Sequence, residues 1–161
     1  MVGALNQEAP YDWATFLHER LTSTSPDAPT GGIDNGGWKV VFTAEPQKTT
    51  GRREVPVDLY SIGLQLSQDG TVSDANGGGP SFKAGISPGM KVVAVDGRAY
   101  THERLEDAIK NGTSGSAPIA LLVVNDEYYR TCQVEYHGGL RYPHLERNAA
   151  RPDYLDELIK P

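Results

Sequence analysis

Apolar and polar residues alternate along several short stretches of the chain, and each of these stretches predicts a β-strand. Ile62, Leu64 and Leu66 alternate with polar or small residues, which is the pattern of a half-buried strand over 62–67. Further strands are predicted by short runs rich in apolar, β-branched or aromatic residues over 38–43, 71–75 and 91–95, and as a closing hairpin over 119–124 and 129–136.

Near the N-terminus the apolar spacing is helical. Trp13, Phe16 and Leu17 recur every three or four residues, which predicts one amphipathic helix over 10–22. The Pro- and Gly-rich stretch 23–37 is typical of a linker, and the polar stretch 44–58 predicts a long loop.

A second amphipathic helix is predicted over 102–111, with Leu105 and Ile109 on its apolar face. Thr101 is placed to act as its N-cap, and Gly112 stands where a left-handed C-cap residue is favoured. Residues 81–84 have room for a single helical turn between the turns that flank them.

Composition narrows the range of partners. Lys and Arg total 15 against 21 for Asp and Glu, and the net charge of −6 argues against binding nucleic acid or an anionic membrane surface. No apolar run approaches the roughly 18 residues of a membrane-spanning helix. The single cysteine, Cys132, excludes an internal disulfide framework. With 18 Gly and 11 Pro, turns are frequent, which disfavours an all-helical chain.

The order of predicted elements indicates an antiparallel α+β fold, because strands and helices do not alternate as in a nucleotide-binding fold. Ser61-Ile62-Gly63-Leu64 resembles the Gly-Leu-Gly-Phe carboxylate-binding loop of PDZ domains, and 83–97 resembles the short helix and strand that follow that loop. Residues 102–111 look like the second PDZ helix. The resemblance implies a PDZ-like, partly open antiparallel β-barrel or sandwich with two helices, plus N- and C-terminal flanking arms.

A second resemblance involves the flanks. Residues 11–17, 37–42 and above all 136–147 look like the C-terminal region of bacterial glycyl aminopeptidases, zinc metallopeptidases whose catalytic domain precedes a PDZ domain. This second resemblance implies that the chain has three parts. These are a helical remnant of the preceding catalytic domain and linker (1–37), a PDZ domain (38–137) and a C-terminal tail packing on the domain (138–161). We expect helix 11–21 and the tail to pack on the PDZ core or on each other, or else to be the remnant of a missing interface.

The family's catalytic helix carries His-Glu-x-x-His, and this chain lacks that motif. His18-Glu19 and His102-Glu103 each begin it, but neither stretch has the second histidine one helical turn later. We therefore expect no catalysis and no cofactor in this chain, and zinc in the catalytic domain of the parent peptidase. The compartment stays open between bacterial cytoplasm and periplasm.

The PDZ resemblance assigns peptide binding to eight residues, which are Ser61, Ile62, Gly63, Leu64, Leu66, His102, Glu106 and Ile109. A peptide would add as a strand beside 62–67, its carboxylate on the N–H groups of 62–64. Ile62, Leu64 and Ile109 would line the pocket for its last side chain, and His102 would select the residue two positions before the terminus. Asp58 and Glu106 depart from the family pattern, because both are acidic and oppose a carboxylate.

The expected partner is a C-terminal or internal peptide segment, or the catalytic domain of the parent. Two alternatives remain open: a groove filled by the parent's own chain that serves only a structural, interdomain role, and an independent enzyme. Cys132, His137 and His144 match no common zinc spacing, and 112–116 lacks the last glycine of a nucleophile elbow, so both sets are interpreted as structural.

Overall fold

The computed structural model describes residues 2–8, 11–24, 29–46, 57–115 and 117–159. The helices are α1 (Val2–Glu8), α2 (Trp13–Thr22), α3 (Gly31–Asn35), α4 (Val57–Ser61), α5 (Pro80–Lys83), α6 (His102–Asn111) and α7 (Tyr154–Ile159). The strands are β1 (Trp38–Thr43), β2 (Leu64–Leu66), β3 (Val72–Ala75), β4 (Lys91–Val95), β5 (Arg98–Ala99), β6 (Ile119–Asn125), β7 (Tyr128–Val134) and β8 (Tyr142–Arg147). Among these residues no helix is long and apolar enough to cross a membrane.

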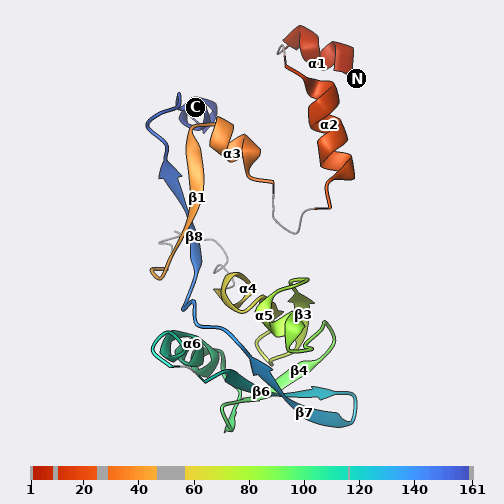
Figure 1. The fold of residues 1–161 in the computed structure, drawn as a ribbon, viewed down its shortest axis with the longest axis vertical. Helices are drawn as coiled ribbons and strands as arrows, with labels where there is room; N and C mark the ends of the chain where they lie inside the picture. The colour runs from red at the N-terminus through yellow and green to blue at the C-terminus, as the bar shows by residue number, and fades with distance from the viewer. Residues whose placement is uncertain (1, 9–10, 25–28, 47–56, 116, 160–161) are drawn as a thin grey trace.

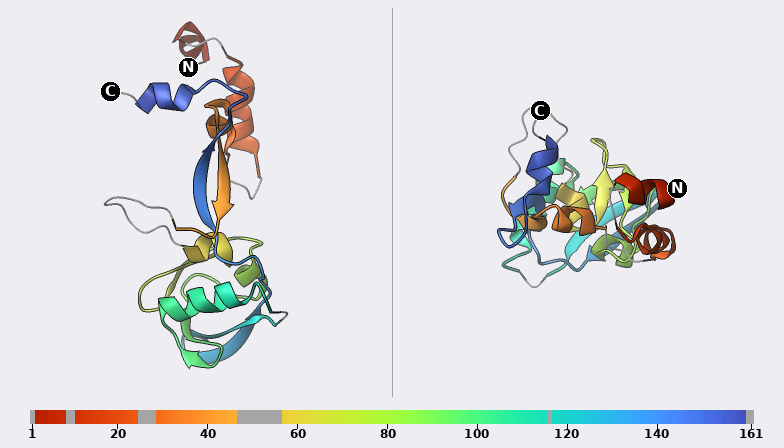
Figure 2. Two further views of the ribbon diagram at one scale, coloured as in Figure 1. Left: turned by 90° about the vertical axis from the view of Figure 1, so that its left-hand side faces the viewer. Right: turned by 90° about the horizontal axis from the view of Figure 1, so that it is seen from above.

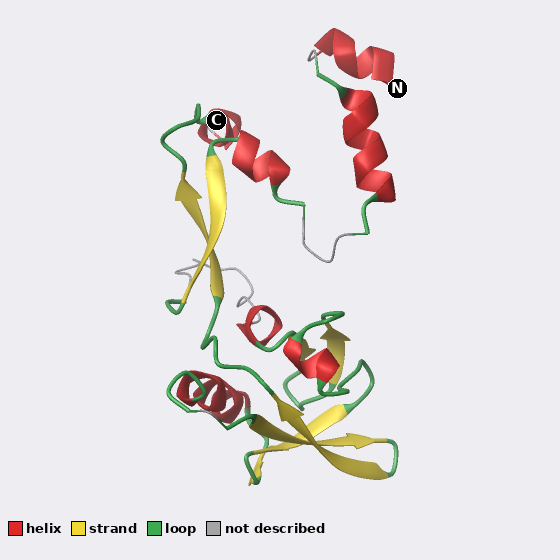
Figure 3. Ribbon diagram, viewed as in Figure 1, coloured by secondary structure: helices red, strands yellow, loops and turns green. Residues whose placement is uncertain are grey.

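The strands form three antiparallel sheets, which confirms a mixed α+β fold (Figure 3). The largest has the order β5-β4-β6-β7, β2 pairs with β3, and β1 pairs with β8. The two-stranded β1–β8 ribbon extends away from the globular part, and α3 and α7 lie at its far end (Figures 1 and 2). The described strands close into no barrel, and a sandwich arrangement stays a prediction.

The core lies between the sheets of the globular part and α6. Ile119, Leu121 and Val123 alternate along β6 with less buried residues, so one face of the strand packs inward as its period of two requires. Leu105 and Ile109 of α6 reach the same cluster from the helix side. Leu140 joins it from the segment that leads out of the core toward β8.

Helix α6 begins and ends where the sequence predicts, with one difference at its end. The Thr101 hydroxyl accepts the backbone N–H of Arg104 at 3.2 Å, which is the expected N-cap. Gly112 has a φ of −58°, so the left-handed C-cap is wrong. Its N–H donates to the Ala108 carbonyl, and a Cβ there would lie 3.1 Å from the Tyr136 carbonyl oxygen. Close packing against 136 therefore favours glycine here.

The C-terminal tail pairs with the strand predicted at 38–43. That strand, β1, pairs with β8 along its full length, from Trp38 opposite Arg147 to Thr43 opposite Tyr142. The two strands lie roughly 100 residues apart in the chain, so no local sequence pattern indicates that they pair. The division into domains stays a prediction.

Two further stretches differ from the sequence prediction. The linker 23–37 contains α3, whose backbone bonds include Gly36 N–H to the Gly32 carbonyl at 3.0 Å, so its glycines do not prevent a helical turn. The loop predicted over 44–58 ends in α4, and its residues 47–56 lie outside the described residues. The sequence analysis predicted no helix at the position of α1.

Helix α2 forms as predicted but is not covered as expected. It begins at Trp13 because the Asp12 carboxylate accepts the N–H of Thr15 at 3.1 Å. Hydrogen bonding by the Thr15 side chain, and then by its backbone N–H, lowers the pKa of Asp12. No residue of α2 is buried. Its aromatic side chains contact one another edge to face, with the rings of Trp13 and Phe16 5.9 Å apart.

Candidate functional site

The predicted apolar pocket residues do converge, but they are covered. Ile62, Leu64 and Ile109 all belong to the core cluster and are fully buried. Leu66 is half-buried and packs against that cluster. In this structure the three side chains expected to line a ligand pocket are part of the hydrophobic core.

The predicted carboxylate loop follows α4, and its donors are already used. The N–H groups of Ile62 and Gly63 both donate to the Asp58 carbonyl, each at 3.0 Å. The Ser61 hydroxyl accepts the N–H of Arg141 at 3.1 Å. Gly63 has a φ of +79°, a left-handed conformation that turns the chain from α4 into β2. In this conformation these two N–H groups are used within the chain, and the carboxylate-binding role assigned to them stays a prediction.

A buried carboxyl lies beside this loop. Asp58 is 1% exposed, and its Oδ2 lies 3.4 Å from Nδ1 of His102, while Oδ1 has no hydrogen-bond partner among the described residues. Glu106 continues the cluster, with Oε1 3.5 Å from Nε2 of His102 and Oε2 3.7 Å from the Lys110 ammonium. Burial raises the pKa of Asp58 to about 6, with His102 opposing the shift and Glu106 adding to it.

The outer edge of β2 faces away from β3. Asn76 N–H donates to the Gly63 carbonyl and Ser67 N–H to the Thr71 carbonyl, both at 2.9 Å. Because backbone groups alternate in direction along an antiparallel strand, those of Leu64 and Leu66 point to the other edge. This edge is covered at fully buried Leu64 and partly accessible at Leu66.

The structure does not bring the considered metal ligands together. Nδ1 of His137 lies 2.9 Å from the Gly112 carbonyl oxygen, and Nε2 of His144 lies 2.8 Å from that of Glu45. Cys132 is buried in β7. Within the described part of the chain, no three His, Cys, Asp or Glu side chains could hold a metal ion. A pocket of about 350 Å³ lies elsewhere and is lined by Ala44, Lys110, Thr113, Gly138, Gly139 and Leu140.

The sequence analysis did not predict the side-chain contacts that join the β1–β8 ribbon to the globular part. The Arg141 guanidinium lies 4.3 Å from the Phe42 ring centroid, and the Phe42 and Tyr60 rings are 5.7 Å apart. These residues come from β1, α4 and the approach to β8. Only their tertiary contact identifies them, since nothing in the local sequence of any one indicates the other two.

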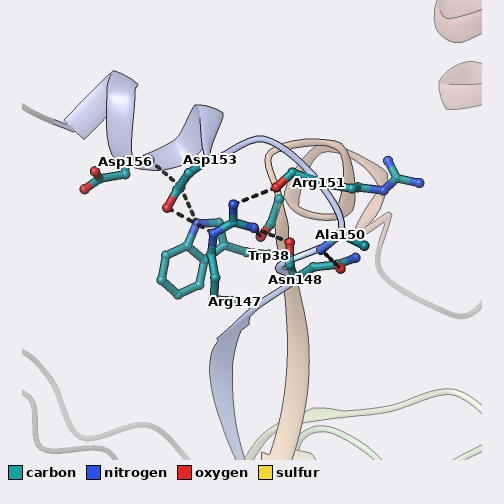
Figure 4. A network of polar contacts seen from close by, with 8 residues as sticks. Trp38, Arg147, Asn148, Ala150, Arg151, Asp153 and Asp156 are labelled. Atoms are coloured by element: carbon teal, nitrogen blue, oxygen red, sulfur yellow. Dashed lines mark hydrogen bonds and ion pairs between the residues drawn. The ribbon is translucent and has the colours of Figure 1, made fainter.

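A polar network at the far end of the ribbon was missed in the same way (Figure 4). The indole N–H of Trp38 donates to Asp153 at 2.9 Å, and Nε of Arg147 donates to the same carboxylate at 3.1 Å. The Arg147 guanidinium also donates to the backbone carbonyls of Gly37, Asn148 and Arg151. Hydrogen bonding to Trp38 is the largest cause of a lowered Asp153 pKa. The network ties α7 to the ribbon.

Comparisons with known proteins support the fold. No family model matches the chain, and no curated protein is similar to it. A crystal structure of an aminopeptidase N family protein from Idiomarina loihiensis superposes with a TM-score of 0.58 at 16% identity. The match covers 99% of this chain and 28% of that one. The HtrA3 PDZ domain bound to a phage-derived ligand matches 71% of this chain and 95% of its own, with a TM-score of 0.36 and 18% identity. The chain thus shares its fold with about a quarter of a longer protein.

Proposed function

We propose that this chain is a noncatalytic, PDZ-like docking module of a longer bacterial zinc-dependent aminopeptidase similar to the glycyl aminopeptidases. The observation that carries the proposal is the partly exposed apolar face of the β1–β8 ribbon. The sequence resemblance and the fold shared with part of an aminopeptidase N family protein support the same assignment.

The ribbon is amphipathic because of its register. Residues directly opposite in an antiparallel pair share a face, so Trp38, Val40 and Phe42 of β1 lie on the same face as Pro143 and Leu145 of β8. Phe42 is 41% and Leu145 47% exposed. An isolated two-stranded sheet is marginally stable in water, so this face has the character of a surface that a partner completes.

The opposite face of the ribbon is more polar and so favours docking on the apolar side; it carries Lys39, Val41 and Thr43 of β1 and Tyr142, His144 and Glu146 of β8. Lys39 and Glu146 are paired across the strands with their Nζ and Oε1 atoms 3.2 Å apart. Both side chains are about half exposed, so this pair contributes little to stability. The partner is therefore expected on the side of Phe42 and Leu145, with the charged side left in solvent.

A noncatalytic role agrees with the chemistry of the described side chains. His102 of α6 faces Asp58 and Glu106 rather than a second histidine one turn later. These groups do not make the ligand set of a peptidase zinc site, which needs paired histidines on one helix face. In the proposed parent, zinc would be held by the catalytic domain and would polarise the scissile carbonyl and its attacking water.

The docking proposal is tested by measuring the affinity of this chain for the separately produced catalytic part of its parent. Leu145→Glu, on the apolar face, should weaken association at least tenfold, because it places a charge in the buried interface. Glu146→Gln, on the opposite face of the same strand, is the matched control and should leave affinity unchanged. Equal effects of the two variants, or none, would reject docking through this face. Stoichiometric zinc with chelator-sensitive aminopeptidase activity in the chain alone would reject the noncatalytic role.

Peptide binding between β2 and α6 is the second candidate, favoured because β2 has a paired neighbour on one edge only among the described strands. An extended peptide could add at the edge near Leu66, with His102 and Glu106 of α6 on the other side. NMR titration with extended peptides should shift the resonances of 64–67 and 102–106. Peptides that shift neither segment would remove this candidate and leave docking alone.

A further inference from the structure

We propose that the pocket at the base of the β1–β8 ribbon anchors the docking partner by taking one uncharged apolar side chain from the catalytic part of the parent. The inference rests on the docking function proposed above and deepens it by naming what the partner inserts. The pocket has a volume of about 350 Å³ and is lined by Ala44, Lys110, Thr113, Gly138, Gly139 and Leu140.

The first argument is the position of the pocket. Ala44 directly follows β1, and Leu140 stands two residues before β8, so the lining includes both chain connections of the ribbon. Figure 1 shows α6 below the base of the ribbon, and residues at and after the C-terminal end of this helix complete the lining. The guanidinium of Arg141, next in sequence to Leu140, lies 4.3 Å from the Phe42 ring centroid. The pocket therefore adjoins the apolar docking face at its globular end.

The second argument is that contacts within the chain already fix the walls of the pocket. Nδ1 of His137 lies 2.9 Å from the Gly112 carbonyl oxygen, which ties the segment 137–140 to the end of α6. The Thr113 hydroxyl donates to the Lys110 carbonyl at 2.8 Å. Gly139 has a φ of +69°, and a Cβ there would lie 2.8 Å from the Thr113 methyl carbon, so glycine allows these two walls to approach. A preformed pocket needs little ordering when a ligand binds.

The third argument is the chemical character of the lining. Lys110 is the one charged residue among the lining residues that the structure describes. Its ammonium lies 3.7 Å from Oε2 of Glu106 and 3.8 Å from Oδ1 of Asp107, on the preceding turn of α6. The ammonium is thus directed along the helix surface, and the methylene stem is the part of this side chain that suits the pocket wall. An acidic ligand would meet these two carboxylates near the rim and a basic one would meet the ammonium, so an uncharged apolar group is favoured.

The fourth argument is size. Pockets for small molecules and cofactors have volumes of about 300–1,000 Å³, so this pocket lies at the lower end of that range. A few side chains that insert into such pockets carry most of the binding energy of an interface, and the flatter contacts around them exclude water. A leucine or phenylalanine of the partner would take the first role here, and the partly exposed Phe42 and Leu145 of the ribbon the second.

The first test uses the chain alone and two capped amino acids of similar size, N-acetyl-leucinamide and N-acetyl-asparaginamide. NMR titration with the leucine probe should shift the resonances of Ala44, Thr113 and Gly139, with a dissociation constant on the order of millimolar for so small a ligand. The asparagine probe should produce less than about a fifth of these shifts at the same concentration. Equal shifts by the two probes, or none by the leucine probe, would overturn the inference.

The second test fills the pocket. Ala44→Trp introduces a large ring from an exposed position in the lining, and Ala99→Trp, at an exposed position of β5, is the matched control. Ala44→Trp should abolish the shifts caused by the leucine probe and weaken association with the catalytic part at least tenfold, whereas Ala99→Trp should do neither. A leucine probe that binds Ala44→Trp as it binds wild type occupies another site, which contradicts the inference. Should Ala44→Trp fail to fold, the titration of the wild-type chain decides.

The association measurements separate this inference from the docking proposal on which it rests. If Leu145→Glu weakens association and Ala44→Trp does not, docking stands and the anchoring role of the pocket is wrong. If neither variant weakens association while the leucine probe still binds in the pocket, docking through the ribbon fails and the pocket is confirmed as a site for an apolar group.

Discussion

Replacing Asp58 by Asn should make the chain progressively more stable than wild type as the pH rises. Folding raises the pKa of Asp58 from 3.8 to about 6, chiefly because burial disfavours the charged carboxylate. A raised folded-state pKa means that the neutral acid suits the fold. The stability that this group contributes is therefore fully present below pH 3.8 and is lost as the pH rises through about 6.

The expected size follows from this shift. Each pKa unit is worth about 1.4 kcal/mol, so a rise of about two units corresponds to about 3 kcal/mol between acid and neutral pH. This figure already includes the opposing effect of His102, whose Nδ1 lies 3.4 Å from Oδ2. The Asp58→Asn variant has nearly the same shape and no ionisation. Its advantage in unfolding free energy should thus grow by about 1–3 kcal/mol from pH 4 to pH 8.

Urea denaturation of both proteins at five pH values between 4 and 8 measures this difference, in which the other titrating groups largely cancel. The change should be steepest between pH 3.8 and about 6, where the folded chain holds the proton and the unfolded chain has lost it. A His102→Gln background supplies the control, since loss of the imidazolium should enlarge the pH dependence. A stability difference that stays constant from pH 4 to pH 8, or that shrinks as the pH rises, would show that burial of Asp58 does not control its ionisation.

Three further predictions test the local structure, the first two by denaturation and the third by amide exchange. Thr101→Ala should cost about 1 kcal/mol by removing the α6 N-cap, with Thr101→Ser as the nearly neutral control. Gly70→Ala should destabilise by well over 1–2 kcal/mol, because φ is +88° and its Cβ would lie 2.4 Å from the Val92 carbonyl oxygen. Gly78→Ala, at φ +78° with no atom near its Cβ, should cost only about 1–2 kcal/mol, and equal losses at the two sites would contradict the steric argument. Arg147→Lys should leave the core intact while exposing the ribbon end to faster amide exchange, because a lysine cannot make the same fork of hydrogen bonds, and unchanged exchange there would argue against a structural role.

The sequence by itself determined the elements whose cause is local. The limits of α6 follow from Thr101 and the spacing of Leu105 and Ile109, and β4 and the β6–β7 hairpin follow from short apolar runs between turns. Hydrophobic periodicity and capping depend on residues within one or two turns of each other, so the sequence alone is enough to predict the elements that they produce. The α+β class followed from the order of these elements, and the candidate strand-and-helix site followed from the PDZ resemblance.

Only the tertiary structure decided how those elements pair and pack against one another. The pairing of β1 with β8 and the burial of Asp58 against His102 depend on which segments meet in space. The family motif at 61–64 predicted a loop with free donors, whereas the N–H groups of Ile62 and Gly63 bond to the Asp58 carbonyl only four and five residues earlier in the chain. That bonding is local, and tertiary contacts decide only that α4 is held against α6 and the approach to β8.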